Sequence, residues 1–187
     1  IQEKSLKPIL SGHDVMGIAQ TGTGKTLAYL LPVLKTWKYN KTGNPTVLVL
    51  VPTRELVVQV TEVLEKLTEN ITARVIGVYG GKNINTQKLL FNDGCDILVG
   101  TPGRIKDHLQ SGRLDLSKLR HVVLDEVDQT LDLDFNEQVE DVIHKSYKTE
   151  SEDHPQTLLF SATCPQWVYK VANKYMKSRY EQVDLIG

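Results

Sequence analysis

The chain has 187 residues, and its 22 Lys and Arg against 23 Asp and Glu give a formal net charge of −1. That balance excludes a protein held to nucleic acid by bulk positive charge, so any polyanion must be bound by a local group of residues or by backbone dipoles. With 40% apolar and 24% charged residues, the composition is that of a single globular domain, here 1–187, and not of a disordered chain.

Compartment and processing signals are sparse. Two cysteines, Cys95 and Cys164, lie outside any CxxC motif, which indicates a reducing, intracellular compartment. No apolar run reaches the roughly 18 residues of a membrane span, so we expect no membrane association. No leader peptide is visible, and a chain that opens at Ile1 is expected to be a piece of something longer.

Short apolar segments alternate with helical patterns along the whole chain. Most of these segments are continuously apolar, as in Val-Leu-Val-Leu-Val at 47–51, which is typical of strands buried on both faces. Helices are predicted at 53–69 and 135–147, where apolar residues recur with the helical period. We therefore predict an α/β fold, a mostly parallel, doubly wound sheet with helices on both faces. The predicted strands are 14–19, 46–51, 74–78, 96–99, 121–125 and 157–161.

Ligands of such sheets bind beyond the carboxyl ends of the strands, and the first strand is followed by a glycine-rich segment. Glycines there allow successive N–H groups to turn toward one anion, and the following helix N-terminus adds positive potential. Lys25 can reach the β- and γ-phosphates of a nucleotide, and Thr26 can offer its hydroxyl to Mg²⁺. The alternative is an ordinary glycine-rich turn. The predicted phosphate-binding residues are Gln20, Thr21, Gly22, Thr23, Gly24, Lys25 and Thr26.

A second strand, Val122-Val123-Leu124, ends in two carboxylates. Asp125 is expected to hold Mg²⁺ through water, because Mg²⁺ keeps much of its hydration shell. Glu126 is expected to orient or deprotonate the attacking water. The alternative is a solvated acidic turn that caps a helix at 127–131.

The other strand ends carry short polar motifs: Pro52-Thr53-Arg54-Glu55-Leu56, Gly80-Gly81, Thr101-Pro102-Gly103-Arg104 and Ser161-Ala162-Thr163. Each could be a capped strand–helix junction, with Thr53 as the N-cap or the first helical residue and Pro102 in the first turn. Thr-Arg and Gly-Arg at helix N-termini also form phosphate sites, and two of them on one sheet edge suit a nucleic-acid backbone. The five histidines have no metal-ligand spacing and are expected at the surface or at strand ends.

Taken in order, AQTGTGKT, PTREL, GG, TPGR, DEVD and SAT resemble the first RecA-like domain of DEAD-box RNA helicases, a P-loop fold, over nearly the whole chain. Val127 stands where that family usually has Ala, as in the nucleolar RNA helicase II/Gu proteins. From about Gly100 onward the sequence is similar to the Gu-beta type, whereas before about Asp96 it looks more like bacterial DEAD-box proteins. The chain is therefore interpreted as a chimera, a consensus or a reconstructed ancestor.

The resemblance implies specific roles. It implies that Gln2, like the glutamine of the family's Q motif, binds adenine; that Lys25, Asp125 and Glu126 are catalytic; and that Thr26 and Asp125 hold Mg²⁺. Asp128, Ser161 and Thr163 would couple the nucleotide site to the RNA site, although Ser161 and Thr163 could instead cap a helix at 165–176. The residues that would line the RNA backbone are Pro52, Thr53, Arg54, Gly81, Thr101, Gly103 and Arg104.

The activity implied by the resemblance is ATP hydrolysis coupled to RNA strand separation. It requires a second RecA-like domain that supplies arginines, and no second set of motifs occurs in this sequence. We therefore expect a monomer that binds ATP weakly and is nearly inactive alone, from the nucleolus if the Gu resemblance holds and from the cytoplasm if the source is bacterial. Two other functions stay open: a nucleotide-gated RNA-binding or protein-docking module without catalysis, and a DNA-directed ATPase.

Overall fold

A computed structural model describes residues 7–19, 24–37, 43–81, 83–112, 114–129, 133–144, 155–176 and 180–184. Its centre is a seven-stranded sheet in the order β3-β4-β2-β5-β6-β1-β7, and every strand pair in it is parallel. The strands are β1 (Val15–Ile18), β2 (Val47–Leu50), β3 (Val75–Val78), β4 (Ile97–Gly100), β5 (His121–Asp125), β6 (Gln156–Ser161) and β7 (Glu181–Asp184).

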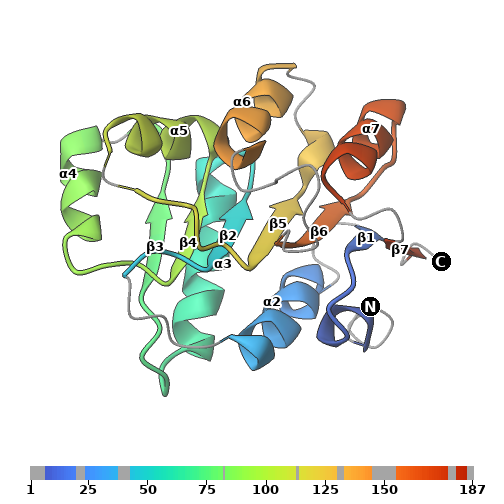
Figure 1. The fold of residues 1–187 in the computed structure, drawn as a ribbon, viewed down its shortest axis with the longest axis horizontal. Coiled ribbons are helices and arrows are strands. Elements are labelled where there is room, and N and C mark those ends of the chain that lie inside the picture. The colour runs from blue at the N-terminus through green and yellow to red at the C-terminus, as the bar shows by residue number, and fades with distance from the viewer. Residues whose placement is uncertain are drawn as a thin grey trace.

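Helices cover both faces of this sheet (Figure 1). The α-helices are α2 (Lys25–Thr36), α3 (Arg54–Leu67), α4 (Ile84–Lys88), α5 (Pro102–Gln110), α6 (Leu133–Ile143) and α7 (Gln166–Tyr175). Short 3-10 helices span η1 (Leu89–Phe91) and η2 (Val127–Gln129), and residues 7–10 are helical as well. None of the described helices is long and apolar enough to cross a membrane.

Two apolar clusters, one on each face, form the core. Along β2, Val47 and Val49 pack in the cluster that contains the inner faces of α2 and α3, whereas Leu48 and Leu50 pack in the one that contains α5, α6 and α7. All four β2 residues are buried because successive side chains of a strand point to opposite faces. This confirms the doubly wound α/β fold that the continuously apolar strands predict.

The predicted elements lie close to the observed ones, with two differences. The six predicted strands match β1 to β6 within one residue at each end, but β7 was not predicted. Its sequence, Glu-Gln-Val-Asp, is polar, and its strand conformation comes from pairing with β1 at the sheet edge. Of the helix expected at 127–131, the described part, η2, is a single turn of 3-10 helix and not an α-helix, and residues 130–131 lie outside the described residues.

Candidate functional site

The phosphate loop joins β1 to α2. The backbone N–H of Ala19, just after β1, donates to the carbonyl of Ser161 at 2.9 Å, so the end of β1 is fixed against β6. Gly24 is the N-cap of α2 with φ of 78°, a left-handed conformation that glycine adopts without a steric penalty. Gln2 and the loop residues Gln20, Thr21, Gly22 and Thr23 lie outside the described residues.

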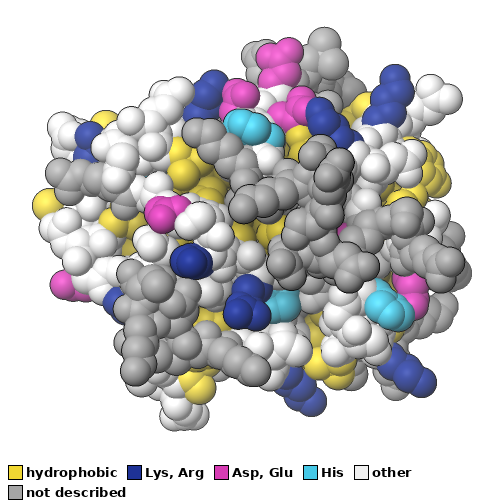
Figure 2. All heavy atoms as spheres, in the orientation of Figure 1, with side chains coloured by type: hydrophobic (Ala, Val, Ile, Leu, Met, Phe, Trp, Pro, Cys, Tyr) yellow, Lys and Arg dark blue, Asp and Glu magenta, His cyan; other side chains and the backbone are white. Residues whose placement is uncertain are grey.

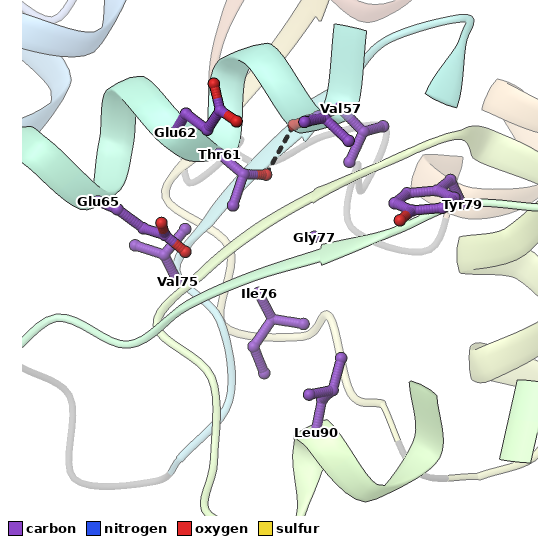
Figure 3. A pocket seen from close by; sticks show the side chains of 10 residues that line it. Val57, Thr61, Glu62, Glu65, Val75, Ile76, Gly77, Tyr79 and Leu90 are labelled. Atoms are coloured by element: carbon purple, nitrogen blue, oxygen red, sulfur yellow. Dashed lines mark hydrogen bonds between the residues drawn. The ribbon is translucent and has the colours of Figure 1, made fainter. Parts of the chain in front are cut away.

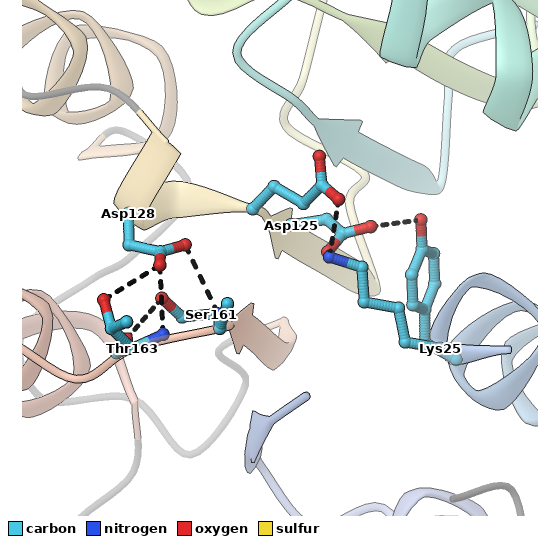
Figure 4. A network of polar contacts seen from close by, with 8 residues as sticks. Lys25, Asp125, Asp128, Ser161 and Thr163 are labelled. Carbon is cyan, nitrogen blue, oxygen red and sulfur yellow. Dashed lines mark hydrogen bonds and ion pairs between the residues drawn. The ribbon is translucent and has the colours of Figure 1, made fainter. Parts of the chain in front are cut away.

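Lys25, the first residue of α2, joins the loop to the acidic strand end. Its Nζ lies 3.1 Å from Asp125 Oδ1 and 2.9 Å from Glu126 Oε1 (Figure 4). The three side chains are at most 4% exposed. A buried charge is tolerated only with a partner, so one cation against two carboxylates makes a tightly held group. The alternative of a solvated acidic turn at Asp125 is therefore wrong.

Tyr29 is a residue of this group that the sequence motifs did not single out. It lies four residues after Lys25 on α2, hence on the same helix face, and its hydroxyl donates to Asp125 Oδ2 at 3.0 Å. Burial and the neighbouring Asp125 charge raise the pKa of Tyr29, so the hydroxyl keeps its proton. The i, i+4 spacing behind the lysine is the sequence signal that could have identified it.

The Asp125 carboxylate is thus held from two sides, by Lys25 and by Tyr29. Burial raises its pKa above the usual value for Asp, and the Lys25 ammonium opposes that rise. A hydrogen bond also links the Thr26 side chain to the Tyr29 hydroxyl, the same hydroxyl that donates to Asp125. A hydroxyl and a carboxylate are the hard oxygen ligands that suit Mg²⁺, an ion that needs only one or two protein ligands because it retains water.

Among the residues that the structure describes, no cluster of three or more His, Cys, Asp or Glu could hold a metal ion. Glu126 has φ of 55° and is the one described non-glycine residue with positive φ. The left-handed turn costs about 1–2 kcal/mol for a residue with a side chain, and such strain is found at functional sites. Here it turns the chain from β5 into η2 while Glu126 stays bound to Lys25.

Asp128, in η2, connects the acidic segment to the end of β6. Its carboxylate accepts hydrogen bonds from the N–H of Ala162 at 3.3 Å, the N–H of Thr163 at 3.0 Å and the Thr163 hydroxyl at 2.9 Å (Figure 4). Burial opposes ionisation, yet hydrogen bonds from the Thr163 and Ser161 side chains lower the pKa of Asp128. The network therefore stabilises a charged carboxylate.

The same geometry decides the alternative role of Ser161 and Thr163. The Ser161 hydroxyl donates to the Thr163 carbonyl at 2.6 Å, and the Thr163 side chain is occupied by Asp128. Pro165 is the N-cap of α7, and no side chain caps that helix. The interpretation of these two residues as helix caps is therefore wrong.

The residues expected to contact RNA follow β2, β3 and β4, which are adjacent at one end of the strand order, whereas the nucleotide residues follow β1 and β5, on either side of β6. The carboxyl edge of the sheet is thus divided into two continuous halves. In the first half, Thr53 is the N-cap of α3 and accepts from the Leu56 N–H at 3.3 Å, and Pro102 begins α5. Both capping predictions are confirmed, and capping leaves the other N-terminal amides of these helices available to an anion.

Tyr79, just after β3, organises this half of the edge. The Arg54 guanidinium lies 5.0 Å from the centre of the Tyr79 ring, a cation–π contact. The Tyr79 carbonyl accepts from Gln87 Nε2 at 3.0 Å, and Gln87 Oε1 lies 3.4 Å from His108 Nε2. Arg54 and Gly81 are exposed, while Arg104 is half-buried beside Asp107.

His108 corrects one sequence expectation, because it is fully buried rather than at the surface or a strand end. Burial, and then the nearby Arg104 charge, lower its pKa, so it is neutral near pH 7. On the face drawn in Figure 2, the described Lys and Arg side chains are dispersed among Asp and Glu and form no single basic patch.

Comparison with known proteins agrees with this geometry. A model of the family "DEAD/DEAH box helicase" matches residues 1–171. The chain is 62% identical to the ATP-dependent RNA helicase DDX50 of Mus musculus and 54% identical to the nucleolar RNA helicase 2 of Rattus norvegicus, in both cases over 100% of the chain. It covers only 26% and 24% of the length of these two proteins.

Solved structures show the same similarity. A DEAD box protein from the hyperthermophile Methanococcus jannaschii superposes with a TM-score of 0.86 at 34% identity, over 98% of this chain and 48% of that one. A hypothetical ATP-dependent RNA helicase from Sulfolobus tokodaii gives a TM-score of 0.82 at 32% identity, over 98% of this chain and 51% of that one. The chain therefore belongs to the DEAD/DEAH box helicase family and has its RecA-like fold.

Proposed function

We propose that this chain is the ATP-binding domain of an ATP-dependent RNA helicase, and that its parent couples ATP hydrolysis to RNA backbone binding and local unwinding. The observation that carries the proposal is the buried group in which Lys25 Nζ lies 2.9–3.1 Å from Glu126 and Asp125. A lysine at the start of a helix, paired with two carboxylates at a neighbouring strand end, is the charge arrangement that a magnesium–triphosphate complex needs.

In the proposed mechanism Lys25 exchanges partners. When a triphosphate binds, Lys25 Nζ leaves its ion pairs with Asp125 and Glu126 and donates to the terminal phosphates. Asp125 and the Thr26 hydroxyl would hold Mg²⁺, and the ion would supply positive charge to neutralise the phosphates. Glu126, released from Lys25, orients the attacking water and accepts its proton. Gln2 is proposed to bind adenine, and Gln20 through Gly24 to bind the phosphates.

RNA is proposed to lie along the half of the edge formed by β2, β3 and β4. Helix N-termini and guanidinium groups suit phosphates, so contacts there position the RNA backbone without reading its sequence. Asp128 would relay changes at the nucleotide site, because it bonds to the segment after β6 at Thr163. The proposed RNA-contacting residues are Pro52, Thr53, Arg54, Gly81, Thr101, Gly103 and Arg104.

The parent is proposed to supply a second RecA-like domain whose arginines stabilise the transferring phosphoryl group, consistent with a chain that spans about a quarter of its curated relatives. By analogy with GTPases such arginines are worth about 10³–10⁵ in rate, so we expect this single domain to be a nearly inactive monomer. The relatives named nucleolar RNA helicase 2 support a nucleolar parent.

Calorimetry tests nucleotide binding by the chain itself. We expect ATP with Mg²⁺ to bind more tightly than GTP. Lys25→Ala should weaken ATP binding at least ten-fold, since a hydrogen bond to a charged group is worth about 1.5–3 kcal/mol. Equal ATP affinity in Lys25→Ala would contradict the site. Gln2 is tested in the same experiment, since Gln2→Ala should remove the preference for ATP.

Activity is tested in the chain joined to its second domain. ATP turnover should rise with RNA and much less with DNA, which distinguishes an RNA helicase from a DNA-directed ATPase. The Glu126→Gln variant should still bind ATP but no longer hydrolyse it. If the unmodified two-domain parent shows no RNA-stimulated ATP turnover, it is a binding module without catalysis.

A further inference from the structure

The outer edge of β3 is open. In the part of the chain that the structure describes, β3 is an edge strand that pairs only with β4. The carbonyls of Arg74 and Val78 accept from the N–H groups of Ile97 at 3.1 Å and Thr101 at 3.2 Å. Because the polar groups of a strand alternate in direction, those of Val75 and Gly77 point away from β4.

The next carbonyl that points away from β4, that of Tyr79, accepts a hydrogen bond from outside the sheet. It accepts a side-chain hydrogen bond from Gln87 Nε2 at 3.0 Å, so a donor from outside the sheet already satisfies one end of the row. Unpaired N–H and C=O groups along an edge are a template for a further strand. β3 offers such a row beside Val75 and Gly77.

A groove of about 330 Å³ follows this edge on both of its sides (Figure 3). Figure 3 shows Val57 and Thr61 of α3 above the strand and Leu90 below it. Gly77, in the middle of β3, carries no side chain, and Thr61 and Val57 of α3 lie close over its backbone. The lining residues are Val57, Val58, Thr61, Glu62, Glu65, Val75, Ile76, Gly77, Tyr79 and Leu90.

The groove is apolar with an acidic rim. Leu90 is 50% exposed and Val58 37% exposed, large fractions for apolar side chains that line one groove. Glu62 and Glu65 are the charged residues of the lining, and both are exposed on α3. Two carboxylates repel a phosphate backbone and attract Lys or Arg, so the charge of the groove favours a basic peptide over RNA.

We propose that the open edge of β3 binds an extended segment of a protein partner, added parallel or antiparallel to β3 as an outer strand. Its backbone pairs with Val75 and Gly77, and its apolar side chains contact Leu90 on one side of the strand. On the α3 side its Lys or Arg side chains pack their apolar stems beside Val58 and pair with Glu62 and Glu65. Strand addition is a known mode of peptide recognition, in which main-chain hydrogen bonds give affinity and alternate side chains give specificity. The surface is distinct from the proposed nucleotide site.

Backbone amide NMR of the full 187-residue chain tests this, with the peptide acetyl-Lys-Val-Lys-Val-Lys-Val-amide as the probe. We expect saturable shifts of the Val75 and Gly77 amides with a Kd below about 1 mM. The peptide in which Glu replaces each Lys should bind at least ten-fold more weakly. Glu65→Lys should weaken the basic peptide about five-fold, the effect of one exposed ion pair near 1 kcal/mol. Glu69→Lys, exposed but outside the groove, is the matched control and should leave the Kd unchanged.

Several results would overturn the proposal. One is the absence of saturable shifts at Val75 and Gly77 with wild-type chain, a measurement that does not depend on any variant folding. Another is equal binding of the basic and acidic peptides. Shifts of the same amides caused by oligouridine would assign the groove to RNA. Shifts caused by raising the concentration of the chain alone would assign it to a second copy.

Discussion

The hydroxyl of Tyr29 donates a hydrogen bond to Oδ2 of Asp125 at 3.0 Å, while Lys25 Nζ lies 3.1 Å from Oδ1 of the same carboxylate. Both partners belong to one face of α2, one helical turn apart. The helix that follows the phosphate loop therefore fixes the orientation of the acidic strand end. In the proposed mechanism, in which Lys25 turns to a triphosphate, Tyr29 would remain to hold Asp125 in place.

Tyr29→Phe should loosen that carboxylate without changing the shape of the core. Loss of a donor to a buried charged acceptor costs about 1–3 kcal/mol. We expect the free energy of unfolding in urea to fall by about 1 kcal/mol, and the Mg²⁺-dependent part of ATP affinity to fall about five-fold in calorimetry with and without EDTA. Tyr169→Phe, on the opposite face of the sheet in α7, is the control and should change neither quantity. An unchanged Mg²⁺ dependence in Tyr29→Phe would remove Tyr29 from the magnesium site.

Thr163→Val should break one arm of the Asp128 network. The variant keeps the side-chain shape and the backbone N–H bond to Asp128 but loses the hydroxyl donor at 2.9 Å. We expect a destabilisation of about 1 kcal/mol, typical of a lost hydrogen bond. In the two-domain parent, ATP binding should stay near normal while RNA stimulation of turnover falls. If stimulation persists fully, Thr163 has a structural role only.

Gly77→Ala should be destabilising for a reason visible in the packing of α3 on β3. A Cβ at this position would lie 2.7 Å from Thr61 Oγ1 and 3.2 Å from Val57 Cγ1, so α3 would have to shift. Overpacking of this kind costs about 1–3 kcal/mol, measurable by urea denaturation. Gly80→Ala, where a Cβ meets nothing within 4 Å, should change stability by less than about 0.5 kcal/mol. Similar values for the two variants would show that α3 is less closely packed.

Stability should decline in mild acid because of two histidines, His108, which is buried, and His121, which is half-buried. Burial lowers the pKa of His108 and of His121 below the usual 6.5. Above that value both are neutral in the folded and unfolded chain, so they contribute no pH dependence. As pH falls below 6.5, the unfolded chain takes up protons first, and the free energy of unfolding decreases until the lower folded pKa values are reached. Urea denaturation between pH 7.5 and 5 should show this slope, and His121→Gln should reduce it.

Much of the fold could be predicted because the sequence of its central strands is continuously apolar. β2 and β4 are continuously apolar, and only a position between two helical layers buries both of their faces. Thr53 and Pro102 could be assigned to helix starts because capping is local chemistry. β7 could not be predicted, since a polar segment at a sheet edge becomes a strand through its neighbour and not through its own side chains.

Within the candidate site, the order of residue types along the chain was enough to nominate Lys25, Asp125 and Glu126, because phosphate and magnesium chemistry require these groups after strands. Whether they meet depends on strand order, which no local pattern encodes. In the folded chain, β1 and β5 lie on either side of β6, and the two carboxylates are buried against the Lys25 ammonium. Tyr29 adds a further donor to Asp125, and the outer edge of β3 stays open. Short segments of sequence determine which chemical groups follow each strand, whereas the packing of the whole chain determines which strands lie next to one another.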